Sequence, residues 1–249
     1  MNLFIWQTIY VLGGVLMLPF APFLYLQGQY VRRKIGLLPD AQGEKRGISG
    51  KGDEIVKMLV IGESTVAGLG ARTHEAALAG QFAHFLSAKI GKKIEWLVIG
   101  KNGVTAKRTI ELLVPQIPSG EKFDYIMLGV GGNDVLKLSS PRKWRRDALE
   151  LLAIMRETFP KAVFFMTNAP AVHLSPVLPQ PLKFILGNLS ALHDKNSQEF
   201  MAQMEKVHYF HRPDEVTEGF FADGIHPSEK GYTDWSRRMI DFFTEKYGF

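Results

Sequence analysis

Two short segments of the chain carry side chains that together could perform nucleophilic chemistry. Ser64 follows Gly62 and Glu63 directly after an apolar run, and Asp223 precedes His226 by three residues in a turn-rich segment. This spacing lets the Asp223 carboxylate reach the imidazole of His226. A hydroxyl, an imidazole and a carboxylate are the groups that an activated serine requires.

Two further segments carry hydrogen-bond donors at comparable positions. Asn102-Gly103 follows a second apolar run, and Gly131-Gly132-Asn133-Asp134 follows a third. Donors in such places could face the negative oxygen that develops when a hydroxyl attacks a carbonyl group. Both segments could also form turns, a role that is compatible with binding an oxyanion. We interpret Asp134 as a helix or loop cap.

The first and last segments also have explanations that involve no chemistry. A serine after a strand is often a capping residue in a loop, and Ser64 could be one. Asp223 and His226 could cap the last helix, because Ser228-Glu229 is a start signal for a helix. These alternatives remain open when each segment is taken alone.

Apolar runs alternate with helical stretches along the chain, and these elements must position the four segments. Strands are predicted at residues 56–61, 94–99, 125–130, 162–167 and 207–210. Helices are predicted at residues 76–90, 106–113, 141–159, 182–204 and 229–247. This order predicts an α/β fold with a parallel sheet covered on both faces. Ser64 then lies at the carboxyl end of the first strand, where open α/β sheets bind ligands.

Composition limits the class of protein. The 249 residues, 46% of them hydrophobic, suffice for one α/β domain with an appendage and exclude a disordered chain. A formal net charge of +5 without an Arg-rich arm or an RNA-binding aromatic signature makes nucleic acid a poorer expectation than a membrane surface. The absence of cysteine excludes disulfides and thiolate sites, and the histidines show no metal-ligand spacing.

The first 35 residues predict a membrane anchor. Residues 3–26 are almost wholly apolar, which is enough to cross a hydrocarbon core, and aromatic residues could lie at its interfaces: Trp6, Tyr10 and Tyr25. The competing interpretations are a cleaved signal peptide, a lipid-lying segment and a buried helix. A signal peptide is disfavoured because no basic n-region and no small-residue cleavage site is present. Pro19 and Pro22 could kink the helix or make it shallow.

Charge after the apolar segment bears on its orientation. Arg32, Arg33 and Lys34 follow it, so the positive-inside rule predicts a catalytic domain on the cytoplasmic face. Residues 36–52 are rich in Gly, Pro and charge without apolar period, which is typical of a linker. We therefore divide the chain into an anchor (1–35), a linker (36–52) and a catalytic domain (53–249).

Basic residues also surround Trp144 at helical spacing: Arg142, Lys143, Arg145 and Arg146. Such a run is usually a solvated helix face. The alternative hypothesis is a second contact with anionic lipid headgroups.

Taken together, the four segments resemble the sequence blocks of the SGNH hydrolase superfamily, also called GDSL esterases and lipases. The blocks are named for Ser, Gly, Asn and His, which stand here at Ser64, Gly103, Asn133 and His226, and the resemblance covers about residues 55–245. The chain departs from the common pattern at Glu63, where the family usually has aspartate. That difference concerns the positioning of the serine turn.

The resemblance implies a flavodoxin-like three-layer α/β/α sandwich whose five-stranded parallel sheet has its first strand at the centre. It also implies that Ser64 attacks an ester carbonyl, His226 accepts the proton and Asp223 orients the ring. The oxyanion donors would be the N–H groups of Ser64 and Gly103 and the side-chain amide of Asn133. Neither a cofactor nor a metal is required.

We therefore expect a membrane-anchored serine ester hydrolase that acts on small-molecule or lipid esters, such as lysophospholipids, short acyl esters or thioesters. An acyltransferase or glycan deacetylase on the same fold, and a non-catalytic membrane-bound module, remain alternatives. His173 and Leu178 lie in a Pro-rich apolar loop, residues 169–186, that could form the wall of a substrate pocket. The sequence carries no indication of oligomeric state.

Overall fold

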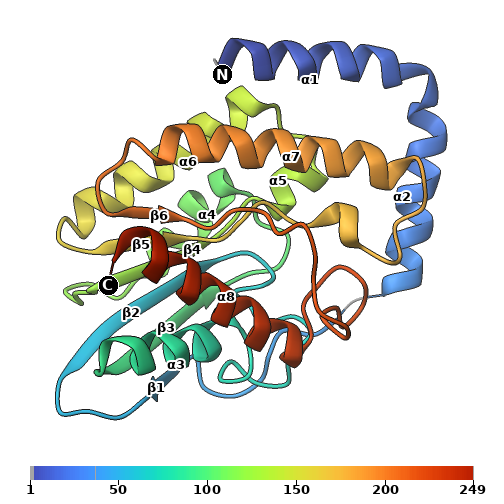
Figure 1. Cartoon of the computed structure of the whole chain (residues 1–249). Helices are drawn as coiled ribbons and strands as arrows, with labels where there is room; N and C mark the ends of the chain where they lie inside the picture. Colours follow the sequence, from blue (N-terminus) through green and yellow to red (C-terminus); the bar gives the residue numbers. More distant parts are fainter. Residues whose placement is uncertain (1–2, 37, 249) are drawn as a thin grey trace.

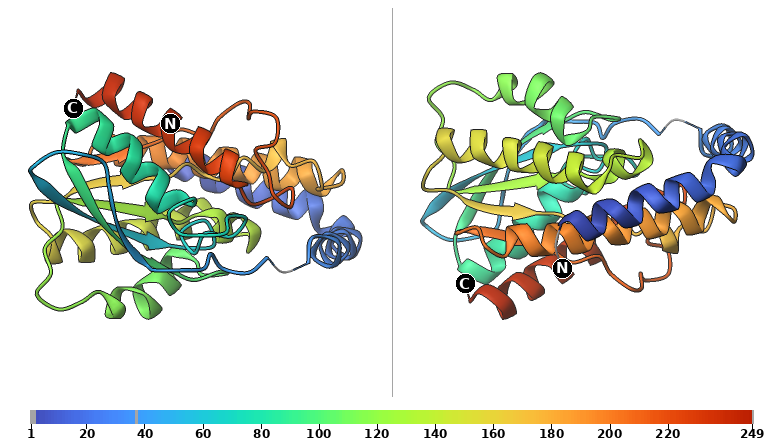
Figure 2. Two further views of the ribbon diagram at one scale, coloured as in Figure 1. Left: turned by 90° about the horizontal axis from the view of Figure 1, so that it is seen from below. Right: turned by 90° about the horizontal axis from the view of Figure 1, so that it is seen from above.

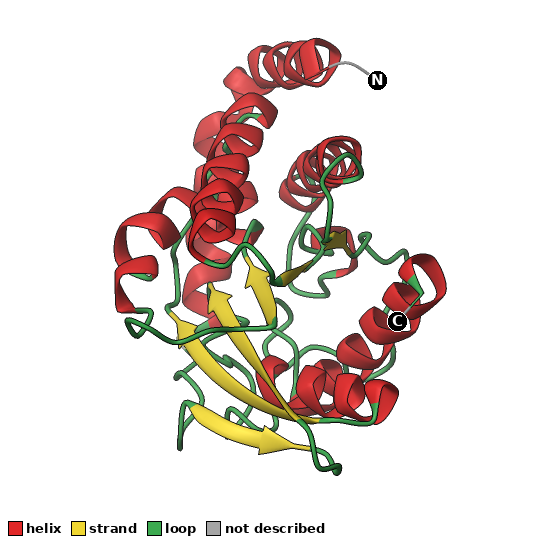
Figure 3. Ribbon diagram, turned by 90° about the vertical axis from the view of Figure 1, so that its left-hand side faces the viewer, coloured by secondary structure: helices red, strands yellow, loops and turns green. Residues whose placement is uncertain are grey.

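A computed structural model describes residues 3–36 and 38–248. Residues 1–2, 37 and 249, which belong to the expected anchor, linker and catalytic domain, lie outside the described part of the chain. The described residues form an α/β fold in which helices lie on both sides of one sheet (Figure 1, Figure 3).

The sheet has six strands in the order β1-β3-β2-β4-β5-β6. Five of them are parallel: β2 (Ile55–Gly62), β3 (Lys93–Gly100), β4 (Tyr125–Gly129), β5 (Val163–Met166) and β6 (Val207–Tyr209). β2 lies between β3 and β4, so the first parallel strand is central (Figure 1). The predicted parallel strands and their flavodoxin-like order are confirmed.

The sixth strand corrects the expected linker. β1 (Arg46–Ser49) pairs antiparallel with the edge strand β3, inside the stretch that we assigned to a surface linker over residues 36–52. Its sequence gives no strand signal, because it is four residues long and its one large apolar side chain, Ile48, is 63% exposed. Backbone pairing and the close approach of Gly47 to the Trp96 ring hold it in place.

Successive side chains along each strand point to opposite faces of the sheet, and this divides the hydrophobic core into two clusters. From β2, Leu59 and Ile61 face one side of the sheet, where α4 (Ala106–Leu112), α6 (Pro141–Thr158) and α7 (Leu182–Met201) pack. Met58 and Val60 face the other side, which is covered by α3 (Leu78–Ile90) and α8 (Glu229–Tyr247). The predicted three layers are thus present (Figure 2).

Short helical pieces complete the chain. α5 (Gly132–Leu136) follows β4, and 3₁₀ turns lie at η1 (Leu18–Phe20), η2 (Val114–Gln116) and η3 (Val172–Leu174).

The N-terminal segment bends across the domain. α1 (Leu3–Met17), η1 and α2 (Ala21–Ile35) follow one another, with Pro19 and Pro22 at the bend. α1 packs against α6 and α7, and α2 turns away steeply from α1 (Figure 1). The whole segment is long and apolar enough to cross a membrane, a property that signal sequences share.

Candidate active site

Glycines at the ends of three neighbouring strands make room for the turn that carries Ser64. Gly62 of β2 is in register with Gly100 of β3 and with Gly129 of β4. A Cβ on Gly62 would lie 2.0 Å from the carbonyl oxygen of Gly129, and one on Gly100 would lie 2.5 Å from the Ala67 nitrogen. Only glycines in this row let residues 63–67 fold back across the carboxyl edge of the sheet.

The structure brings Ser64 and His226 together from distant parts of the chain. Ser64 Oγ lies 3.2 Å from His226 Nε2, and His226 Nδ1 lies 2.8 Å from Asp223 Oδ2. With its proton on Nδ1 donated to Asp223, the imidazole presents a free lone pair on Nε2 to the hydroxyl. This is the geometry in which a serine hydroxyl can lose its proton to a neighbouring base.

Asp223 also holds the turn that carries His226. Its Oδ1 accepts the backbone N–H groups of Ile225 and His226 at 2.8 and 2.7 Å. Burial acts to raise the pKa of Asp223, but the hydrogen bonds from His226 and Ile225 outweigh it and leave the pKa below its ordinary value. The carboxylate is therefore charged at neutral pH, as a partner for an imidazolium requires.

The loop after β5 braces this turn from outside. Ser175 Oγ donates to the carbonyl of Gly224 at 2.7 Å, and a Cβ on Gly224, whose φ is 89°, would lie 2.5 Å from the Val177 side chain. Glycine thus permits both the left-handed conformation and the close packing.

Donors converge on the same edge of the sheet. Gly103, with φ 81°, lies between β3 and α4, and Asn133 lies in the first turn of α5. Within residues 3–36 and 38–248, the N–H groups of Ser64 and Gly103 donate to no protein acceptor. Asn133 Nδ2 donates one hydrogen to Glu63 Oε2 at 2.7 Å and carries a second one.

Glu63 is a buried side chain of the site whose partners the sequence did not reveal. It is 7% exposed, and its carboxylate accepts the N–H of Gly132 at 2.7 Å and both the N–H and the Nδ2 of Asn133 at 2.8 and 2.7 Å. It thus connects the Asn133 side chain to the residue that precedes Ser64. The departure from aspartate at this position was the available signal, although its partners were not.

Burial raises the pKa of Glu63 to about 7. The hydrogen bonds from Asn133 and Gly132 oppose that rise, and the nearby charge of Asp134 adds to it. The carboxyl group that binds Asn133 therefore titrates close to neutral pH.

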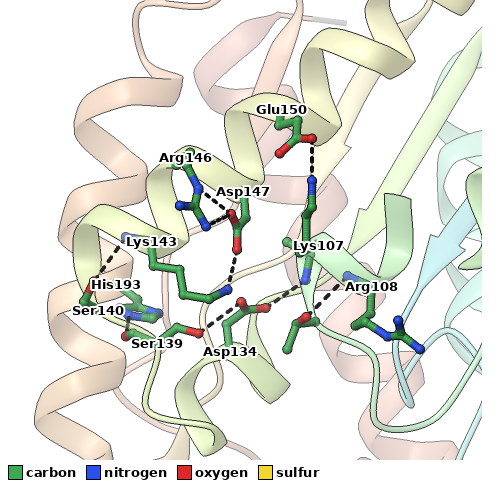
Figure 4. A network of polar contacts seen from close by, with 12 residues as sticks. Lys107, Arg108, Asp134, Ser139, Ser140, Lys143, Arg146, Asp147, Glu150 and His193 are labelled. Carbon is green, nitrogen blue, oxygen red and sulfur yellow. Dashed lines mark hydrogen bonds and ion pairs between the residues drawn. The ribbon is translucent and has the colours of Figure 1, made fainter. Parts of the chain in front are cut away.

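Asp134 connects the second and third segments. Its fully buried carboxylate accepts the N–H of Ala106, the first residue of α4, at 3.0 Å, and the hydroxyl of Ser139 at 3.4 Å (Figure 4). Burial raises its pKa. The predicted role of Asp134 as a cap is confirmed.

The two residues expected in a substrate pocket have other contacts. His173 Nδ1 accepts a hydrogen bond from Arg212 at 3.0 Å, and Leu178 is 8% exposed within an apolar cluster that includes Val31. Neither lines the cavity of about 90 Å³ behind the Ser64 turn or the larger one beside α1. Within residues 3–36 and 38–248, no group of three or more metal-binding side chains is present.

The pKa of Glu63 predicts a pH dependence of stability. The ordinary pKa of a glutamate, 4.5, applies to Glu63 in the unfolded chain, so the folded protein holds the proton more tightly. The free energy of unfolding therefore falls as pH rises from 4.5 to about 7. Relative to Glu63→Gln, wild type should lose about 3 kcal/mol across this window. Urea denaturation of both proteins from pH 4.5 to 8 measures the difference, and a constant difference would refute the assignment.

Comparisons with known proteins identify the family and the fold. Residues 60–233 match the GDSL-like Lipase/Acylhydrolase family. A lipase from a goat rumen metagenome, Lip_vut3, superposes with a TM-score of 0.59 at 14% identity, over 75% of this chain and 96% of that one. Phospholipase A1 from Streptomyces albidoflavus NA297 gives a TM-score of 0.51 at 14% identity, over 75% and 98%.

A carbohydrate esterase of family two from Clostridium thermocellum gives a TM-score of 0.54 at 13% identity, over 78% of this chain and 65% of that one. No curated protein matches the sequence significantly. The structural likenesses show the fold, and the family match covers more than half of the chain. The chain belongs to the GDSL-like lipase/acylhydrolase family, as its four sequence segments predicted, and is a hydrolase of the esterase or lipase type.

Proposed function

We propose that the chain is a membrane-associated serine ester hydrolase with Ser64 as nucleophile, His226 as general base and Asp223 as the orienting carboxylate. The single observation that carries this proposal is the continuous contact from Ser64 Oγ through the His226 ring to Asp223, at 3.2 and 2.8 Å. A non-catalytic module would have no need of this alignment, so the enzyme is favoured over the binding module.

The proposed reaction forms an acyl-enzyme. Ser64 Oγ attacks the ester carbonyl while its proton passes to His226 Nε2, and the same proton then goes to the departing alcohol. Asp223 stabilises the imidazolium during both transfers. Water, deprotonated by His226, attacks the acyl-enzyme and releases the acid and the free serine.

The oxyanion of each tetrahedral intermediate would be bound by the N–H groups of Ser64 and Gly103 and by Asn133 Nδ2. This assignment is supported by the lack of a protein acceptor for the two backbone donors within residues 3–36 and 38–248. Glu63 supports it further, because it binds one hydrogen of Asn133 Nδ2 and thereby orients the other. Donors held in place before the reaction stabilise the charge without reorganisation.

Substitutions of the proposed nucleophile and oxyanion donor should reduce hydrolysis of p-nitrophenyl esters. Ser64→Ala should abolish it, and Asn133→Ala should lower kcat at least 100-fold, since one such donor contributes about 3 kcal/mol to the transition state. Ser119→Ala, which alters an exposed serine, is the matched control. Ser64→Ala protein that is folded and still hydrolyses esters at the wild-type rate would eliminate the proposal.

Membrane association is supported by the two-sided character of α1 and α2. Their polar groups contact the domain: Trp6 Nε1 donates to Glu199, the Arg142 N–H donates to Gln7, and Gln27 bonds to the backbone of Gln180 and Leu182. Large apolar side chains on the same helices are exposed, among them Phe4, Leu12, Leu16 and Leu26. The N-terminal helices thus contact the domain with one face and expose apolar side chains on the other, and such an exposed face can bind to a bilayer.

The bend favours a segment that lies in one leaflet. α1 and α2 have 15 residues each, about 22 Å of helix, whereas the hydrocarbon core is about 30 Å thick. The basic residues at the end of α2, Arg32, Arg33 and Lys34, favour the cytoplasmic leaflet.

Charges placed on the exposed face of α1 should release the protein from lipid. Leu12 and Leu16 are 65% and 68% exposed, so the double variant Leu12→Lys, Leu16→Lys should fold normally, hydrolyse a soluble ester and fail to float with neutral phosphatidylcholine vesicles. Ile48→Lys changes an equally exposed residue on β1 and should float like wild type. Undiminished flotation of the double variant would exclude this membrane contact.

A further inference from the structure

A basic pocket lies on the surface beside the N-terminal helix. It is open to solvent, has a volume of about 500 Å³, and is formed by α1, the start of α4, the α5–α6 connection and α6. The residues used below are Tyr10, Thr105, Arg108, Lys137, Ser140 and Lys143. No aspartate or glutamate is among the residues that line it.

Three cations face a pocket in which only two have carboxylate partners. Arg108 pairs with Glu111 at 2.6 Å. Lys143 pairs with the buried Asp147 at 2.5 Å (Figure 4). Asp147 also pairs with Arg146 at 2.8 Å, so its charge is shared. Of the basic run around Trp144, Lys143 lines this pocket.

Lys137 supplies the charge that no carboxylate balances. It is exposed, and its Nζ donates to the carbonyl oxygen of Gly103 at 2.6 Å. Within residues 3–36 and 38–248, it forms no ion pair. A neutral carbonyl leaves the positive charge of Lys137 available to a ligand.

The pocket adjoins the donors proposed for the oxyanion. Lys137 lies one helical turn beyond Asn133, whose carbonyl accepts the Lys137 N–H at 2.9 Å, and its ammonium group touches Gly103. Lys137 therefore connects the pocket to the proposed oxyanion donors, and an anionic group on the substrate could bind there while its carbonyl lies at Ser64.

The N-terminal helix closes the pocket on the side of the exposed apolar surface. The Tyr10 hydroxyl donates to the carbonyl of Leu138 at 2.7 Å, and Leu138 adopts a left-handed φ of 54°, a strained conformation for leucine. Leu138 and Leu136 are 54% and 46% exposed beside it. A ligand that enters from this side passes apolar surface before it meets the cations.

We propose that this pocket binds the phosphate group of a phosphate-bearing ester, so that the substrate class of the enzyme includes acylated glycerol phosphates. The inference rests on the proposed function for its catalytic consequence but not for binding. Ammonium and guanidinium groups, with the hydroxyls of Thr105 and Ser140, supply the charge-assisted donors that a phosphate accepts. The apolar approach beside α1 favours a lipid phosphate over the free anion.

Binding is tested first, on full-length Ser64→Ala protein so that hydrolysis does not interfere. The probes are 1-palmitoyl glycerol 3-phosphate and 1-palmitoyl glycerol, each in neutral detergent micelles, and inorganic phosphate alone. Titration calorimetry should show tighter binding of the phosphate-bearing lipid than of the neutral one. Lys137→Gln should weaken binding of the phosphate-bearing lipid at least tenfold, while Lys122→Gln, an exposed lysine outside the pocket, should not.

Hydrolysis is tested second, as a ratio. The kcat/KM for 1-palmitoyl glycerol 3-phosphate divided by that for 1-palmitoyl glycerol should fall at least tenfold in Lys137→Gln and stay constant in Lys122→Gln. Equal affinity for inorganic phosphate and for the phosphate-bearing lipid would support the phosphate site and reject the lipid source. Equal binding of both lipids in wild type, or no effect of Lys137→Gln, would overturn the phosphate site even if Ser64→Ala abolishes hydrolysis.

Discussion

The close approach of three strand ends is the constraint on which the site depends. Gly100, Gly62 and Gly129 lie in one row, and their lack of side chains lets the turn after β2 lie directly against the neighbouring backbones. Any larger residue in the row would lift this turn and move Ser64 away from the His226 ring. The contact between Ser64 and His226, which are 162 positions apart, therefore depends on glycine at all three positions of the row.

Two carboxylates flank the serine, and their surroundings shift their pKa values in opposite directions. Asp223 receives a hydrogen bond from an imidazole and two from the backbone, which keep its pKa below the ordinary value despite burial. Glu63 receives three hydrogen bonds but lies deeper, and burial raises its pKa to about 7. We propose that Asp223 stabilises the positive charge on His226, whereas Glu63 orients Asn133. Opposed shifts of neighbouring acids are typical of sites with divided roles.

The sequence predicted the parts of the fold that depend on local pattern. Each parallel strand is an apolar run, and the runs of β2, β3 and β4 end at glycine, so both the sheet and the positions of Ser64, Gly103 and Asn133 could be anticipated. The His226 turn was equally visible, because Asp223 caps its own segment and needs no distant partner to do so.

Features created by tertiary packing could not be predicted. β1 forms because the edge strand β3 offers unpaired backbone groups. The sequence of Arg46–Ser49 has no pattern that predicts a strand. The partners of Glu63 lie 69 and 70 residues away, and the fold-back of α1 depends on contacts with α6 and α7. The contact between His173 and Arg212 joins residues 39 positions apart. Local periodicity holds no information on any of these contacts.

In the mechanism that we propose, the fold makes one serine hydroxyl a nucleophile. The most direct measurement is mass-spectrometric peptide mapping of the native protein after reaction with a fluorophosphonate ester, which forms a stable adduct with an activated serine. We expect a single phosphonylated residue, Ser64, and no adduct on the protein unfolded in urea. An adduct on another residue, or none on the folded protein, would contradict it.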